Sequence, residues 1–290
     1  MEMTVNSNGV LFATTSGRDK LVAIDVRTNI TLWEQKLPVE RNVRAGGLFA
    51  DESTVFVVTT FNVDAYEAIT GEPKWSAALG AGSVSIISQL DSDVVRIYYG
   101  DRVYEVDAIT GETLRKIAKG DTVWVSGNVA LRSSSINQLE AFDNVSNEKL
   151  WSNPISFYFA DIWPPQFVRN NTLLVGDIPG PSWNSITGLV ALDLRTGEFV
   201  WRRPETYLSR VAIDRRSLTG YVMRDDFTLV TLDLNSGKVI GETNFISSSN
   251  EIQSRFVSVA VYESIVVVSF GDSGQTFGLE IGGLSKSNIP

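Results

Sequence analysis

The chain has 290 residues, a formal net charge of −9, 43% hydrophobic residues, and neither histidine nor cysteine. Without these two residue types there is no Ser-His-Asp or Cys-His catalytic site, no thiolate nucleophile and no ordinary zinc site. The acidic balance also argues against a nucleic-acid partner, because phosphate binding needs a basic surface.

The amino terminus and the hydropathy of the chain bear on localisation. No apolar run approaches the roughly 20 residues of a membrane-spanning helix, and the first residues, Met1 to Thr4, lack the basic start and apolar stretch of a secretory signal. The protein is then either cytoplasmic or exported with its signal removed from this sequence. No linker, low-complexity tract or composition shift interrupts the chain, so a single domain over 1–290 is expected.

A short phrase recurs six times: an acidic residue, then Ser or Thr followed by Gly or Asn, and usually Trp eight positions after the acid. The acidic anchors are Asp25, Glu67, Asp107, Asp143, Asp193 and Asp233, and Glu280 marks a fainter seventh copy without the turn pair. The eighth position holds Trp33, Trp75, Arg115, Trp151, Trp201 and Gly241. Successive anchors lie 36 to 50 residues apart, a period typical of toroidal all-β arrays.

The phrase has a local physical explanation. A strand runs into the acid and then into a hairpin turn with one residue at positive φ, which Gly adopts freely and Asn tolerates next best. Because Asn29 and Asn147 are the only replacements for Gly, one turn geometry is expected in all six copies. The tryptophan then lies on the following strand, where its ring is expected to bury against the neighbouring unit.

β-rich runs precede the phrases, and each follows a polar turn. They cover residues 10–13, 55–58, 95–99, 173–175 and 265–268. With one strand before each turn, one after it, one into the acid and one through the tryptophan, every repeat has four strands, A to D. The prediction is an all-β chain forming a single propeller of seven four-stranded blades, with eight as the alternative. In the last blade only the tail 284–289 remains for strand D, and it is expected to pair with strand C because an uncovered edge promotes aggregation.

The phrase is clearest at 191–201, ALDLRTGEFVW, and it resembles the tryptophan-docking repeat of the quinoprotein-like (PQQ-like) β-propellers. That WD-like family includes pyrroloquinoline-quinone alcohol dehydrogenases and the non-catalytic lipoprotein of the bacterial outer-membrane barrel assembly machine, and the chain is nearest in kind to the latter. The resemblance covers roughly residues 1 to 282, and it implies a propeller in the cell envelope. Arg115, Gly241 and the seventh copy depart from the motif, so their docking contacts should be missing or altered.

The resemblance does not imply catalysis. The related dehydrogenases are longer, eight-bladed enzymes with an adjacent Cys pair, an Asp base and a calcium ion, and this chain has no cysteine. No cofactor is therefore expected. Calcium has two weak candidate loops, 224–226 (RDD) and 271–274 (GDSG), but neither has the ligand spacing of a calcium loop, so both are interpreted as solvated turns.

Two sets of residues are candidates for binding a partner. Arginines fall in or beside the loops from D to A and from B to C, which should emerge on one face: Arg41, Arg44, Arg210 and Arg255, with Arg18 and Arg102. They either attract an anionic peptide or sugar or form an ordinary solvated surface. The longest interval, from Asp143 to Asp193, holds two aromatic and proline-rich insertions with Phe157, Tyr158, Phe159, Trp163 and Trp183. These rings either recognise a protein or sugar, or fold inward to plug the channel or cover an edge.

The hypothesis is a non-catalytic propeller scaffold that binds a protein or peptide partner through loops on one face, in an extracytoplasmic setting. The alternatives are a quinoprotein-like enzyme or carbohydrate-binding propeller that uses the channel mouth, and the ligand-sensing domain of a larger membrane protein. The sequence does not identify the partner or the oligomeric state.

Overall fold

The structure is a computed structural model, and all of its described secondary structure is β-strand. It describes residues 3–15, 19–37, 47–59, 61–79, 85–91, 93–99, 102–118, 123–126, 128–135, 138–143, 145–154, 166–168, 171–179, 186–214, 216–245, 257–270, 275–280 and 286–289. The chain divides into two compact units, residues 1–119 with 256–290, and residues 120–255, which are treated separately.

The first unit contains four antiparallel sheets, each formed by four strands consecutive in the sequence. Two of these sheets contain β1 (Met3–Val5), β2 (Val10–Thr14), β3 (Lys20–Asp25) and β4 (Ile30–Lys36), and β5 (Leu48–Ala50), β6 (Thr54–Val58), β7 (Asn62–Glu67) and β8 (Pro73–Ala78). The others contain β9 (Ser85–Asp91), β10 (Val94–Tyr99), β11 (Arg102–Asp107) and β12 (Thr113–Ala118), and β25 (Val257–Tyr262), β26 (Ile265–Phe270), β27 (Gln275–Glu280) and β28 (Lys286–Ile289).

The second unit contains three sheets of the same kind. Their strands are β13 (Val123–Ser126), β14 (Val129–Ser135), β15 (Gln138–Asp143) and β16 (Lys149–Asn153); β17 (Gln166–Val168), β18 (Thr172–Pro179), β19 (Ile186–Asp193) and β20 (Phe199–Tyr207); and β21 (Ala212–Asp214), β22 (Thr219–Met223), β23 (Thr228–Asp233) and β24 (Val239–Asn244). Across the described residues, seven four-stranded meanders are present, as expected for seven propeller blades.

The order of strands within each sheet is the predicted one. The third strand ends at or beside the repeated acid, and the fourth carries the tryptophan position. The tail also behaves as expected: β28 pairs with β27 from Thr276↔Ile289 to Leu279↔Lys286, so the last sheet obtains its fourth strand from the end of the chain.

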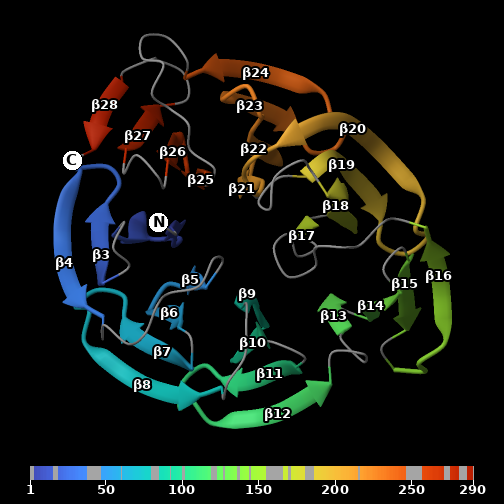
Figure 1. Cartoon of the computed structure of the whole chain (residues 1–290), viewed down its shortest axis with the longest axis horizontal. Coiled ribbons are helices and arrows are strands. Elements are labelled where there is room, and N and C mark those ends of the chain that lie inside the picture. The colour runs from blue at the N-terminus through green and yellow to red at the C-terminus, as the bar shows by residue number, and fades with distance from the viewer. Residues whose placement is uncertain are drawn as a thin grey trace. The chain divides into compact units, whose positions relative to one another are not determined.

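The core lies between successive sheets of a unit. In the first unit, Phe12 and Leu21 of the β1–β4 sheet pack with Val55, Val57 and Tyr66 of the β5–β8 sheet, and all five are buried. The first strands of these sheets lie side by side, β1 beside both β25 and β5 (Figure 1). A blade therefore buries its apolar faces against its neighbours within the unit rather than within itself.

Candidate functional site

The repeated acids shape their own turns. In five copies the Oδ1 atom of the anchor accepts a hydrogen bond from the backbone N–H two residues on, and in four of them also from the next N–H. For Asp107 these bonds come from Ile109 at 2.9 Å and Thr110 at 2.7 Å. The backbone N–H of Thr110 lowers the pKa of Asp107, and that of Ser146 lowers the pKa of Asp143. The Asp107 and Asp143 carboxylates are thus stabilised in their ionised form as acceptors of the turn hydrogen bonds.

The predicted left-handed turn residue is present in all six copies. Its φ is +57° at Asn29 and +60° at Asn147, and it lies between +67° and +77° at Gly71, Gly111, Gly197 and Gly237. The prediction of one shared turn geometry is confirmed.

The four tryptophans dock as the sequence predicts, each on the turn of the following sheet. Each indole N–H donates to the carbonyl of the residue after the next anchor: Trp33 to Ala68, Trp75 to Ala108, Trp151 to Leu194 and Trp201 to Leu234, at 2.8 to 3.1 Å. Trp151 and Trp201 are each only 8% exposed. All four contacts lie inside one unit or the other.

The docked rings explain which of the six turns need glycine rather than asparagine. This dependence was not predicted from the sequence. A Cβ atom added to Gly71, Gly111, Gly197 or Gly237 would lie 2.5 to 2.6 Å from the Cδ2 atom of the docked indole. Asn occurs only where the preceding copy offers no tryptophan: Asn147 follows the copy with Arg115, and no copy precedes Asn29 in the chain. Glycine is therefore needed at four turns for close approach as well as for positive φ.

The three departures from the motif provide no indole at the docking position. Arg115 is exposed, Gly241 has no side chain to dock, and the strand position that faces Gly278 holds Ser287. In the other sheets the matching cross-strand pairs are Ala23 with Trp33, Ala65 with Trp75, Ala141 with Trp151 and Ala191 with Trp201.

The joint between the β25–β28 and β1–β4 sheets is held differently. The guanidinium of Arg27 donates to the hydroxyl of Tyr262 and pairs with the carboxylate of Glu263 at 3.1 Å. It also lies over the Tyr262 ring, 4.9 Å from its centroid. The buried ring in turn covers Gly9, where an added Cβ would lie 2.7 Å from Tyr262 Cε1.

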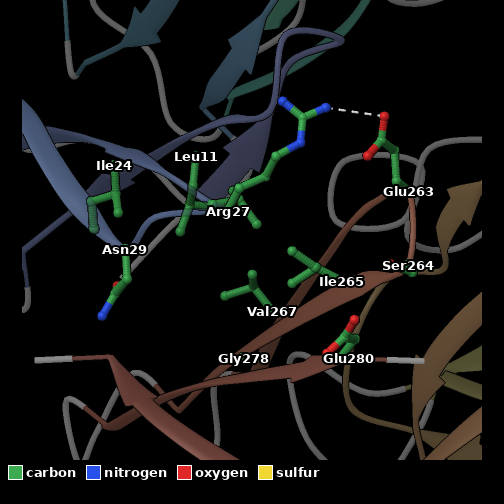
Figure 2. Close-up of a pocket in the computed structure, with 11 residues that line it drawn as sticks. Leu11, Ile24, Arg27, Asn29, Glu263, Ser264, Ile265, Val267, Gly278 and Glu280 are labelled. Carbon is green, nitrogen blue, oxygen red and sulfur yellow. Dashed lines mark hydrogen bonds and ion pairs between the residues drawn. The ribbon is translucent and has the colours of Figure 1, made fainter. Parts of the chain in front are cut away.

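Beside this contact lies a pocket of about 490 Å³, a volume in the range of ligand-binding pockets. Figure 2 shows Leu11, Ile24, Ile265 and Val267 on its apolar wall. Val26 also lines the pocket. Asn29, Gly278 and Glu280 complete it, with the Arg27–Glu263 ion pair at the rim.

Of the predicted binding residues, the structure describes the side chain of only Arg210. Phe157, Tyr158, Phe159, Trp163, Trp183, Arg41, Arg44, Arg255 and Arg18 lie outside the described residues, and only the backbone of Arg102 is described. Arg210 is half-buried in the loop from β20 to β21, as placed by the sequence. The preceding residue, Ser209, accepts a hydrogen bond from the N–H of Met223 at 2.9 Å.

The expectation that D-to-A and B-to-C loops share one face holds where Arg210 lies. The N–H of Leu208, after β20, donates to Met223 O at the end of β22, and the N–H of Asp225 donates to Thr206 O. The start of a D-to-A loop and a B-to-C loop therefore lie against each other.

The first calcium candidate is a charged turn. The Asp226 carboxylate accepts from Arg224, whose guanidinium also pairs with Glu242 at 2.8 Å. The hydrogen bond from Arg224 lowers the pKa of Asp226. The second candidate, 271–274, lies outside the described residues, and the described part of the chain holds no group of three or more acidic side chains suited to a metal ion. Within that part, no helix has the length and hydropathy to cross a membrane.

Solved structures with the same fold include BamB from Moraxella catarrhalis, with 16% identity, a TM-score of 0.58, and 99% of this chain and 87% of that chain covered. Kluyveromyces lactis Hsv2 has 10% identity and a TM-score of 0.66, with 99% and 98% covered. At these identities the likeness shows the fold, a β-propeller. A comparison with curated protein sequences found no match.

The sequence model described as outer membrane protein assembly factor BamB matches residues 2–126 and 99–277, which together span nearly the whole chain. The chain therefore belongs to the outer membrane protein assembly factor BamB family of PQQ-like propellers.

Proposed function

We propose that this protein is a non-catalytic scaffold, a single propeller domain over 1–290, that binds a protein partner in the bacterial cell envelope. Membership of a family described as an outer membrane protein assembly factor supports an extracytoplasmic role in assembly. Five of the six repeated acids accept turn hydrogen bonds, and four turn glycines lie against docked tryptophans, so the recurring pattern of the repeat serves the fold.

The observation that supports this position for the binding site is the length of three strands in one sheet. Strands β18 and β19 have eight residues and β20 has nine, whereas every other described strand has seven or fewer. The ends of β18 and β19 form the two sides of the predicted aromatic insertion 178–187, and the predicted insertion 155–165 precedes the same sheet. We propose that the partner site is formed by the predicted aromatic residues Phe157, Tyr158, Phe159, Trp163 and Trp183, with Arg210 in a D-to-A loop of the same unit. Arg41, Arg44 and Arg255 are the further candidates that the sequence offers. Aromatic residues and arginine are the usual anchors of protein interfaces.

Two measurements test this site. A photoreactive amino acid at position 158 should cross-link the partner in envelope extract, whereas one at Val145 should not. Val145 is a matched control, because it is 84% exposed in a C-to-D turn at the opposite end of the strands. The double change Trp163→Ser and Trp183→Ser should abolish capture and alter unfolding free energy by less than about 1 kcal/mol.

Two results would contradict the proposal. Capture that survives the double change would move the site elsewhere, and a stability loss of several kcal/mol would mean that the rings plug the propeller. Dye reduction after addition of pyrroloquinoline quinone and calcium would favour the enzyme alternative.

A further inference from the structure

Four contacts between successive sheets, here called joints, show how the chain binds an indole at the turn after the third strand. At each, an indole lies over the left-handed turn residue and donates its N–H to the carbonyl one residue after the anchor. The residue paired with the tryptophan across the two strands, named the floor alanine, lies two residues before the anchor of the sheet that provides the tryptophan.

The pocket beside Tyr262 has the corresponding parts but no tryptophan of its own. Gly278 corresponds to the floor alanine, Val26 to the carbonyl-bearing residue and Asn29 to the turn glycine, and all three line the pocket. No donor to the Val26 carbonyl is found among the described residues. The position that provides the ring elsewhere is Ser287, on a strand that pairs with β27 without the register shift of the other sheets.

We propose that this pocket binds the indole of a tryptophan presented by the partner protein. The proposal rests on the protein-binding function above and adds a second contact site, separate from the aromatic loops. The aliphatic wall of Leu11, Ile24, Ile265 and Val267 contacts the ring faces. The indole N–H donates to the carbonyl of Val26 or to the carboxylate of Glu280, which is exposed and has no ion-pair partner among the described residues.

The Arg27–Tyr262 contact leaves the pocket available to a ring from another protein. Because Arg27, Tyr262 and Glu263 already join the two sheets, the pocket is not needed to hold them together. In the four tryptophan joints the indole stacks on a turn glycine, and a Cβ atom there would collide with the ring. Asn29 occupies the corresponding turn position at this pocket, so its Cβ atom restricts how closely an indole can stack on the turn. An incoming ring is not tied to strand β28, and the pocket volume of about 490 Å³ gives it room beyond the Asn29 side chain.

The test uses N-acetyl-5-fluorotryptophanamide and fluorine NMR on the full chain. We expect line broadening of the probe that unlabelled N-acetyltryptophanamide reverses. Its 1-methyl analogue, which lacks the N–H donor, should compete at least about fivefold more weakly. Asn29→Gly should tighten binding about fivefold or more, because the Cβ that obstructs the ring is removed. Asn147→Gly, the same change in another turn with a φ of +60° instead of +57°, should leave binding unaltered.

A variant that should lose probe binding shows whether the probe occupies this pocket. Ile265→Lys places a charge on the half-buried apolar wall and should abolish broadening, with thermal melting used to check that the variant folds. If it does not fold, the comparison of Asn29→Gly with Asn147→Gly decides.

The proposal is overturned if millimolar probe shows no broadening with either wild type or Asn29→Gly, if the 1-methyl analogue competes equally well, or if a folded Ile265→Lys variant binds as before. Such a failure leaves the loop-mediated function standing, because the cross-linking from position 158 tests that function without this pocket.

Discussion

Substituting Gly197 by asparagine separates the two reasons for glycine at the turn. Asn29 and Asn147 already adopt φ near +60° in equivalent turns, so the change at Gly197, where φ is +73°, introduces little backbone strain. The new Cβ, however, would lie 2.5 Å from Cδ2, 2.7 Å from Cε3 and 2.8 Å from Cγ of Trp151. These are ring atoms of a side chain that is only 8% exposed, so the ring itself must move.

The expected cost follows from this collision. Overpacking in a core costs about 1–3 kcal/mol, and full loss of the docked ring sets an upper limit of about 3–5 kcal/mol. We therefore expect Gly197→Asn to lower the free energy of unfolding by about 1–3 kcal/mol in urea melts followed by circular dichroism. The reverse change, Asn147→Gly, should be neutral or slightly stabilising, because a φ of +60° suits glycine and, among the described residues, the side chain takes part in only one exposed hydrogen bond, accepted by its Oδ1 atom from the Arg132 guanidinium.

A double-mutant cycle makes the argument specific. In a Trp151→Ala background, Gly197→Asn should cost less than about 0.5 kcal/mol, because the ring that it meets is gone. An equal cost with and without Trp151, or no cost in the wild-type background, would refute the role of the ring in selecting glycine.

Three further predictions concern other contacts. Trp201→Ala should cost about 3–5 kcal/mol in urea melts, and a change below about 0.5 kcal/mol would mean that the ring is not docked. Backbone N–H groups lower the pKa values of Asp25, Asp107, Asp143 and Asp233 in the folded chain. Because the folded-state pKa values are lowered, these carboxylates stabilise the folded chain above the ordinary pKa of 3.8, and this contribution is lost as the pH falls below it. The urea midpoint should therefore drop between about pH 5 and pH 2. A midpoint that does not change with pH would contradict the turn hydrogen bonds. Tyr262→Ala removes a buried ring and should cost several kcal/mol of unfolding free energy. Arg27→Ala removes a half-exposed ion pair and should destabilise the protein much less. Thermal melts showing the reverse order would mean that the ion pair rather than the ring stabilises this joint.

Local features of the repeat were predictable from sequence. The acid, the turn pair and the tryptophan lie within nine residues, so short-range rules on positive φ and strand alternation were enough for the turn and the fourth strand. The pairing of the tail with β27 was also predictable, because its sheet otherwise lacked a strand.

Contacts between repeats were harder to predict. The dependence of glycine on the preceding tryptophan had a readable signal, since Gly71, Gly111, Gly197 and Gly237 each follow a copy with tryptophan. This signal appears only when each turn residue is compared with the eighth position of the preceding copy. The Arg27–Tyr262 contact joins residues 235 positions apart, and no repeated pattern marks either of them. The pocket depends on that contact and was not predicted.

The central structural claim is that four indoles are docked by hydrogen bonds between successive sheets. Hydrogen exchange of the indole N–H groups, assigned by single Trp→Phe substitutions, tests this claim most directly. The N–H groups of Trp33, Trp75, Trp151 and Trp201 should exchange far more slowly than that of free tryptophan, because each donates to a backbone carbonyl at 2.8 to 3.1 Å. Exchange of these four protons at the rate of free tryptophan would contradict the docking.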